Sequence, residues 1–197
     1  MRRIALCLLA ALAVAPAAAQ EAGPAAPAAA GPWDPAARAA VQREAMEALA
    51  FLDGNWRGPA TTSELDGELV QTERVGTLLG GTVRVVEGRG YDAQGNTVFN
   101  AFGIISYDPV RRRYMIRTYA AGYHGDYPIE VRPDGFSWSH PAGPGATMRY
   151  NATVRGGEWH EVGERVVEGA EPVRVIELRV RRIGDAEWPQ AGAVAPR

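Results

Sequence analysis

The sequence contains no lysine and a single cysteine, Cys7, near its N-terminus. A chain with one cysteine forms no intramolecular disulfide, so packing and hydrogen bonds must hold its fold. Beyond the first nineteen residues, no apolar run approaches the ~20 residues that a transmembrane helix needs. The formal net charge is −2, which argues against the basic patch that nucleic acid or an anionic membrane surface requires.

Several catalytic signatures are absent as well. No serine lies in a nucleophile-elbow sequence, no glycine loop precedes a helix to cradle a phosphate, and no His-Glu-x-x-His motif occurs. No two of His124, His140 and His160 are spaced to chelate zinc from one element. We therefore expect no catalytic residues and no metal site, in a protein that is not an enzyme.

The N-terminus itself is typical of an export signal. Arg2 and Arg3 precede residues 4–14, an apolar stretch too short to span a bilayer, and residues 17–19 are the small residues of a cleavage site. Cleavage there removes Cys7 and leaves 19 of the 21 basic residues against 23 acidic ones, for a net charge of −4. We expect an exported protein, either periplasmic, in a Gram-negative bacterium, or secreted.

Composition divides the mature chain into three parts. Residues 20–33 are rich in Ala, Pro and Gly and predict a disordered leader, and residues 185–197 predict a disordered tail on the same ground. Residues 34–184 carry periodic apolar positions and predict one domain, a helix followed by a β-barrel.

A single amphipathic helix is predicted over residues 34–52. Asp34 followed by Pro35 is a capping and first-turn signal, and Gly54 marks the end. An apolar stripe at i, i+4, i+8 and i+11 predicts the buried face, which consists of Val41, Ala45, Leu49 and Leu52. We expect this face to pack near one end of the barrel.

The rest of the domain has the pattern of strands joined by tight turns. Segments rich in β-branched and aromatic residues recur every ten to twelve residues or so, separated by Gly, Pro, Asn and Asp. The expected strands are one through Trp56 and those at 68–79, 82–91, 97–107, 113–120, 127–131, 136–140, 147–154, 158–167 and 173–183. No helix lies between them, which excludes a parallel α/β sheet. The predicted fold class is all-β, an antiparallel up-and-down barrel of about eight to ten strands with one N-terminal helix.

The opening of the first strand, GNWRG at residues 54–58, resembles the calycin superfamily, which includes lipocalins and fatty-acid-binding proteins. The resemblance implies that Trp56 closes one end of the barrel and that an arginine of the final strand packs across its ring. Alternation along the last strand places Arg182 on the same face as Ile176 and Leu178. We therefore expect a cation–π contact between Arg182 and Trp56 that helps to close the barrel.

More closely, the chain is similar to an uncharacterised lipocalin-like family of bacterial exported proteins, labelled only as a domain of unknown function. The matching segments are residues 54–58, 72–90 (TERVGTLLGGTVRVVEGRG), 105–114 (opening with ISYDP) and 157–164 around Trp159. Together they extend over roughly residues 52–183. The resemblance implies a fold and implies no reaction.

A barrel of this size holds one small ligand when side chains do not fill its interior. We therefore expect a module that binds a small, largely apolar ligand inside the barrel, in an oligomeric state that the sequence leaves open. Apolar alternation gives the inner-facing candidates Val98, Phe102, Ile104, Met148, Tyr150, Ile176 and Leu178. Since several of these side chains are large, a filled barrel that acts as a structural or protein-interaction module of the cell envelope remains the alternative.

An aromatic cluster surrounds a glycine-containing turn and is expected at the barrel rim. It consists of Tyr119, Tyr123, His124 and Tyr127. Such a cluster stacks a ligand at the mouth, or else covers the barrel end with its rings and leaves the hydroxyl groups in water. The ligand-binding candidates are accordingly Phe102, Tyr119, Tyr123, Met148, Tyr150 and His160.

The resemblance alone makes haem a candidate cofactor. The superfamily includes the nitrobindins, which are barrels with a GxWxG-type opening that bind haem through one histidine. His160 lies on a late strand where such a ligand is expected. The alternative is a partly buried, hydrogen-bonded His160 with no ligand role.

The carboxylates give no acid–base pair in the sequence. Glu161 and Glu164 point to opposite faces by alternation, which places them poorly for joint catalysis. Glu87, with Arg84 and Arg89 nearby, is expected to form part of a charged strand surface.

Overall fold

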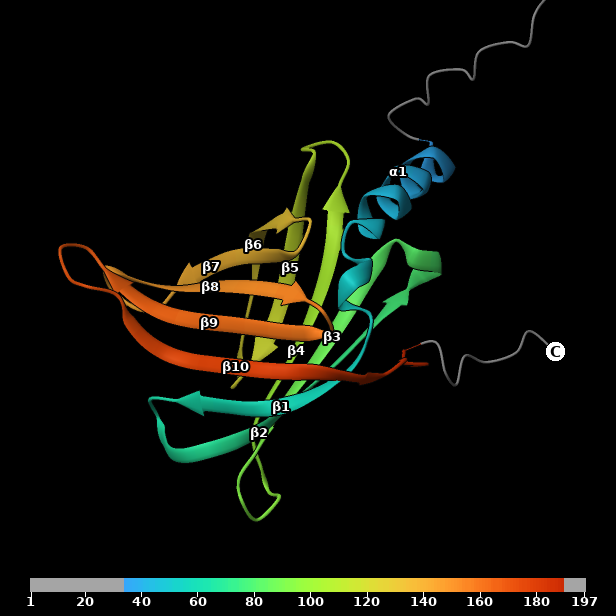
Figure 1. The fold of residues 1–197 in the computed structure, drawn as a ribbon. Coiled ribbons are helices and arrows are strands. Elements are labelled where there is room, and N and C mark those ends of the chain that lie inside the picture. The colour runs from blue at the N-terminus through green and yellow to red at the C-terminus, as the bar shows by residue number, and fades with distance from the viewer. Residues whose placement is uncertain (1–33, 190–197) are drawn as a thin grey trace, which may run out of the picture.

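The structure is a computed structural model that describes residues 34–189. The expected export signal and leader, and residues 190–197 of the expected tail, lie outside this part of the chain. Within it, ten antiparallel strands close into a barrel in the order β1-β10-β9-β8-β7-β6-β5-β4-β3-β2, and one α-helix precedes them (Figure 1). The predicted fold class is confirmed. No helix within residues 34–189 has the length and apolarity to cross a membrane.

The elements follow one another as the turn signals indicate. In chain order they are α1 (Pro35–Glu47), η1 (Ala50–Leu52), β1 (Gly54–Thr62), β2 (Leu65–Leu78), η2 (Leu79–Gly81), β3 (Val83–Tyr91), β4 (Thr97–Asp108), β5 (Arg113–Ala120), β6 (Tyr123–Arg132), β7 (Gly135–Pro141), β8 (Ala146–Arg155), β9 (Glu158–Val167) and β10 (Val173–Gly184). Since the strands alternate in direction, the turns after β2, β4, β6 and β8 lie at the same end as α1. We call this the closed end and the opposite one the open end.

The closed end is sealed by the helix and the 3₁₀ turn η1 that follows it. Met46, Leu49 and Leu52 are fully buried there, and the Trp56 indole Nε1 donates a hydrogen bond to the Leu52 carbonyl at 2.8 Å. The predicted stripe is right at Leu49 and Leu52, whereas Val41 is 44% exposed. The helix ends at Glu47 rather than at Leu52, and Met46 is the residue that it buries.

Arg84 on β3 ties this seal to the barrel. Its side chain is 2% exposed, and its Nε and Nη2 donate to the two carboxylate oxygens of Asp53 at 2.7 and 2.8 Å. Its Nη1 donates to the main-chain carbonyl of Met46. One guanidinium therefore joins the end of the helical segment to the start of β1, in the bidentate geometry that arginine favours with carboxylates.

The expected position of Arg84 on a charged strand surface is wrong. Arg84 shares the inner face of β3 with Val86 and Gly88, because side chains alternate along a strand. Glu87 and Arg89 do lie on the outer face, where they form an ion pair with each other.

The contact expected between Arg182 and Trp56 does not form as a cation–π pair among residues 34–189. The two residues are directly paired between β1 and β10, but the Arg182 Nε donates to the Asp53 carbonyl at 3.0 Å and its Nη2 pairs with Asp185. The guanidinium instead lies over Gly54, where a Cβ would come within 2.7 Å of Nε. Trp56 still closes the barrel, at 1% exposure, through its hydrogen bond and its burial.

The segment after β10 folds back on the outside of the barrel. Arg74 on β2 stands over the Trp188 ring at 4.5 Å, and Phe102 on β4 meets the same ring edge-on at 6.3 Å. Trp188 belongs to the expected tail, and it covers part of the outer face of β2 and β4. That cover allows apolar residues on the outside of the barrel.

Replacing Arg84 tests the seal. We expect Arg84→Leu to lower the free energy of unfolding by about 2–4 kcal/mol, because the Asp53 carboxylate and the Met46 carbonyl lose their donors. The matched control is Arg89→Leu on the outer face of the same strand, which we expect to leave the urea midpoint nearly unchanged. Equal midpoints for the two variants would contradict the role of Arg84.

Candidate functional site

The barrel encloses a cavity of about 770 Å³ that reaches toward the open end. Its floor at the closed end includes Leu52, Phe136 and Trp159. The Phe136 and Trp159 rings meet edge-on, with centroids 5.7 Å apart. Tyr123 and the residues that follow β7 line it near the open end, where Tyr123 is 82% exposed. A cavity of this volume is in the range of small-molecule sites.

Inner-facing glycines help to keep the cavity open. Glu73 on β2 is paired with Gly88 on β3, and a Cβ at Gly88 would lie 2.9 Å from both carboxylate oxygens of Glu73. Tyr150 on β8 is paired with Gly163 on β9, where a Cβ would lie 2.9 Å from the Tyr150 ring. Gly103 adds no side chain to the wall formed by β4. The strands thus give space to polar and aromatic groups that larger residues would displace.

One side of the cavity is an aromatic wall formed by β6, β7 and β8. Its members are Tyr127, Trp138, His140 and Tyr150. Trp138 and Tyr150 stack with centroids 4.4 Å apart and planes 9° apart, and Tyr127 and His140 each lie within 6 Å of Trp138. The His140 Nδ1 lies 2.8 Å from the Pro141 carbonyl, which holds the ring in place. Such a wall offers flat aromatic faces to a ligand.

Two carboxyl groups face the same cavity. Glu73 is 8% exposed, and its Oε1 accepts a hydrogen bond from the Gln71 amide at 2.7 Å. Glu161 on β9 accepts one from the Trp159 indole at 3.1 Å. Both donors are neutral, so neither carboxyl group has a cationic partner in these bonds.

The cavity shifts the acidity of its ionisable groups. Burial raises the pKa of Glu73 to about 8; the Gln71 hydrogen bond opposes this, while the charges of Glu161 and Glu87 add to it. Burial raises the pKa of Glu161 to about 7, against the hydrogen bond from Trp159. Burial also raises the pKa of Tyr150 to about 12. At neutral pH the empty cavity therefore holds Glu73 largely protonated and Glu161 about half protonated.

The structure places some of the expected ligand residues in the cavity. Tyr150, Ile176 and Leu178 line it. Met148 shares the inner face of β8 with Tyr150 by alternation and is 8% exposed, but it is not among the residues that line the cavity.

The expected inner face of β4 is wrong. Phe102 is paired with Glu87 on the outer face of β3, whereas Gly103 is paired with Val86, and both of these line the cavity. Val98 and Ile104 share the Phe102 face by alternation. Phe102 borders the cavity, but its ring packs outside, 6.4 Å from Tyr119 and 6.3 Å from Trp188. Because apolar residues occupy both faces of β4, alternation could not predict which face points into the barrel.

His160 lies away from the cavity, on the opposite face of β9 from Trp159 and Glu161. Its Nε2 bonds the Glu177 carboxylate of β10 at 2.8 Å. This is the partly buried, hydrogen-bonded histidine of the alternative interpretation.

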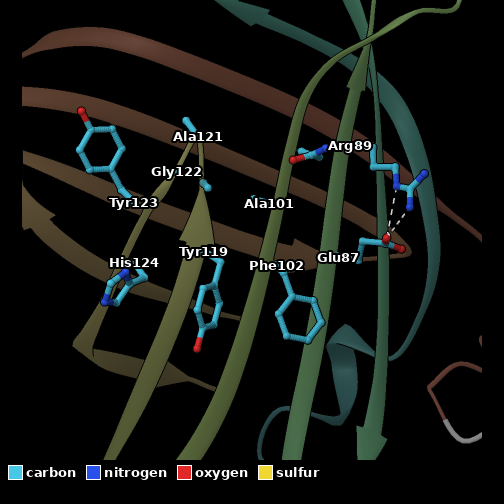
Figure 2. A pocket seen from close by; sticks show the side chains of 11 residues that line it. Glu87, Arg89, Ala101, Phe102, Tyr119, Ala121, Gly122, Tyr123 and His124 are labelled. Carbon is cyan, nitrogen blue, oxygen red and sulfur yellow. Dashed lines mark hydrogen bonds and ion pairs between the residues drawn. The ribbon is translucent and has the colours of Figure 1, made fainter.

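The residues of the expected rim separate into two places. Tyr127 belongs to the aromatic wall, while Tyr119 and His124 stack on each other at 6.2 Å beside a hollow of about 410 Å³ (Figure 2). Figure 2 shows Tyr119 next to Phe102, with the Glu87–Arg89 ion pair on the neighbouring strand. The hollow lies on the outer side of β3, β4 and β5, and it shares Tyr123 and His124 with the cavity.

Sequence reasoning missed Gln71 and Glu73. Both lie between Leu69 and Val75 at every second position of β2, and those two apolar residues are buried on the same face. Two polar residues that interrupt a buried apolar alternation are the signal that was available.

The fold and the cavity together define a closed antiparallel β-barrel with an interior site. No protein-family model matches the sequence, and no curated protein matches it either. A solved structure, that of Rv2717c from M. tuberculosis, is similar with a TM-score of 0.53 and 13% sequence identity, over 70% of this chain and 96% of that one. At this identity the likeness shows the barrel fold alone.

The raised pKa of Glu73 predicts a pH-dependent stability. Between pH 4.5 and about 8 the folded protein keeps a proton that the unfolded chain has released, so the free energy of unfolding falls as pH rises. We expect a Glu73 contribution of up to about 5 kcal/mol, present in full below pH 4.5 and lost by about pH 8. Urea titrations at pH 5 and pH 8 should show that Glu73→Gln makes the difference in the free energy of unfolding between the two pH values clearly smaller, while the raised pKa of Glu161 keeps the remaining part.

The control for this titration is Glu164→Gln, on the outer face of β9 beside Arg149. We expect it to keep the wild-type difference between the two pH values. A Glu73→Gln variant that also keeps it would contradict the assignment.

Proposed function

We propose that the protein binds a small, largely apolar molecule inside the barrel. The observation that carries this proposal is the cavity of about 770 Å³, to whose lining Gly88 and Gly103 add no side chain. A well-packed interior contains few voids larger than a water molecule, and burying carboxyl groups beside such a void costs stability. Binding a ligand is the role that accounts for both features.

The same proposal includes an exported, lipocalin-like barrel of the uncharacterised family named above. Its support is the N-terminal sequence pattern together with the closed ten-stranded barrel of residues 34–189. Mass spectrometry of the protein from its own host tests the export directly. We expect an intact mass that begins at Gln20, in the periplasm or the medium, and a mass that retains residues 1–19 would contradict it.

Two alternatives receive less support. The residue nominated for haem does not fit, because His160 is bonded to Glu177 on the face of β9 away from the cavity. A filled barrel requires an interior without a cavity, which differs from the geometry of the aromatic wall and the floor.

A variant that fills the cavity tests ligand binding. Gly103 lines the cavity, and a Cβ there meets Ile116 at an ordinary 3.6 Å, so Gly103→Leu directs its side chain into the space. We expect the wild type to enhance the fluorescence of the neutral dye Nile red and Gly103→Leu to weaken its binding at least tenfold. The control is Thr153→Leu, an exposed position on the outer side of β8.

Native mass spectrometry of the host-purified protein complements the dye. A bound small molecule in the wild type that is lost from Gly103→Leu supports the proposal. Dye binding that is equal in wild type, Gly103→Leu and Thr153→Leu would overturn it, because the dye would then bind outside the barrel.

A further inference from the structure

The charged groups of the cavity all have one sign. Among the described residues that line it, the carboxyl groups are Glu64, Glu73 and Glu161, and no arginine is present. The histidines that line it, His124 and His140, are on β6 and β7 toward the open end. The deeper part of the site therefore contains carboxyl groups whose bonded partners are the neutral Gln71 and Trp159.

The arginines of the described chain take other places. Those with carboxylate partners on the outer side of the barrel include Arg74, Arg117, Arg149, Arg174 and Arg181. Arg84 is buried, but its guanidinium is bound to Asp53 and the Met46 carbonyl at the closed end. Residues 34–189 thus contain many arginines, and none of these acts on the pKa of Glu73 or Glu161.

From this arrangement we propose that the cavity takes an organic cation: a protonated amine on an apolar, ring-containing body. The ammonium group lies between the Glu73 and Glu161 carboxylates, and the body lies along the aromatic wall of Tyr127, Trp138, His140 and Tyr150. This inference rests on the proposed function and names the class of its ligand.

Both the carboxyl groups and the aromatic wall of the cavity suit such a molecule. A buried carboxylate without a cationic partner is costly, and an incoming ammonium group supplies the missing charge through charge-assisted hydrogen bonds. The faces of Trp138 and Tyr150 attract both rings and cationic groups. An anionic ligand such as a fatty acid would instead place a negative charge beside the Glu73 and Glu161 carboxyl groups, with no arginine among the lining residues to receive it.

Three probes with one indole body separate the charge from the body. Tryptamine carries an ammonium group, tryptophol a hydroxyl group and indole-3-propionate a carboxylate, each at the end of the same two-carbon arm. By calorimetry at pH 7 we expect tryptamine to bind roughly 10- to 100-fold more tightly than tryptophol, because a charge-assisted hydrogen bond contributes about that much affinity. We expect indole-3-propionate to bind most weakly.

Matched variants locate the charge. Glu161→Gln and Glu73→Gln should reduce the affinity for tryptamine toward that for tryptophol and leave tryptophol itself little changed. Glu164→Gln, on the opposite face of the same strand as Glu161, should keep the wild-type preference. Thermal unfolding of each variant at pH 5 checks that the barrel is intact.

A second readout is proton release. The carboxyl pair is surrounded by Glu87 beyond the β3 wall, Tyr150 on β8 and Glu64 toward the open end, none of which is cationic. Because the empty site holds protons that a bound ammonium group displaces, tryptamine binding at pH 7 should release a fraction of a proton. Calorimetry in phosphate and in Tris, whose ionisation enthalpies differ, measures this release.

The outcomes distinguish the two proposals. If Nile red binds in the cavity but the three indoles bind equally, or tryptamine keeps its affinity in both Gln variants, the cation inference fails and cavity binding stands. If neither Nile red nor any indole binds the wild type, the proposed function fails with it.

Discussion

The ladder between β1 and β10 is the pairing on which the rest of the structure depends. It joins the first strand to the last, with Trp56 opposite Arg182 and Ala60 opposite Leu178, and so gives every strand two neighbours. Without it, the sheet would have two exposed edges and its inner face would have no opposite wall. The floor under the cavity also begins here, because the Trp56 ring meets Trp159 edge-on at 5.8 Å.

Closure also separates charge between the two faces of one sheet. Outside, arginines and carboxylates pair across strands in water, where each pair contributes little to stability. Inside, Glu73 and Glu161 lie in a low-polarity space with neutral donors. The inner arrangement reduces the stability of the empty barrel above pH 5 or so, and a site that retains such a cost has a use for it.

The sequence predicted the strands well, because turn residues and β-branched segments are local signals. It was harder to predict which side chains of a strand point into the barrel. On β8 and β10 one face is apolar and the other charged, so Tyr150 and Leu178 were assigned inward, where they lie. On β4 the tail residue Trp188 covers part of the outer face, which lets Phe102 point outward. Arg84 and Glu73 were missed for another reason: both are charged residues that the closed barrel buries, Arg84 against Asp53 and Glu73 opposite Gly88.

The glycines on the inner face have a consequence for how the sequence of this barrel can evolve. Hydrogen bonding between strands is made by the backbone, so a substitution at Gly103 alters the shape of the interior without altering the ladder to β3 or β5. Related chains can therefore diverge in the molecule they accept through single replacements at such positions, while the scaffold that surrounds the site is inherited unchanged.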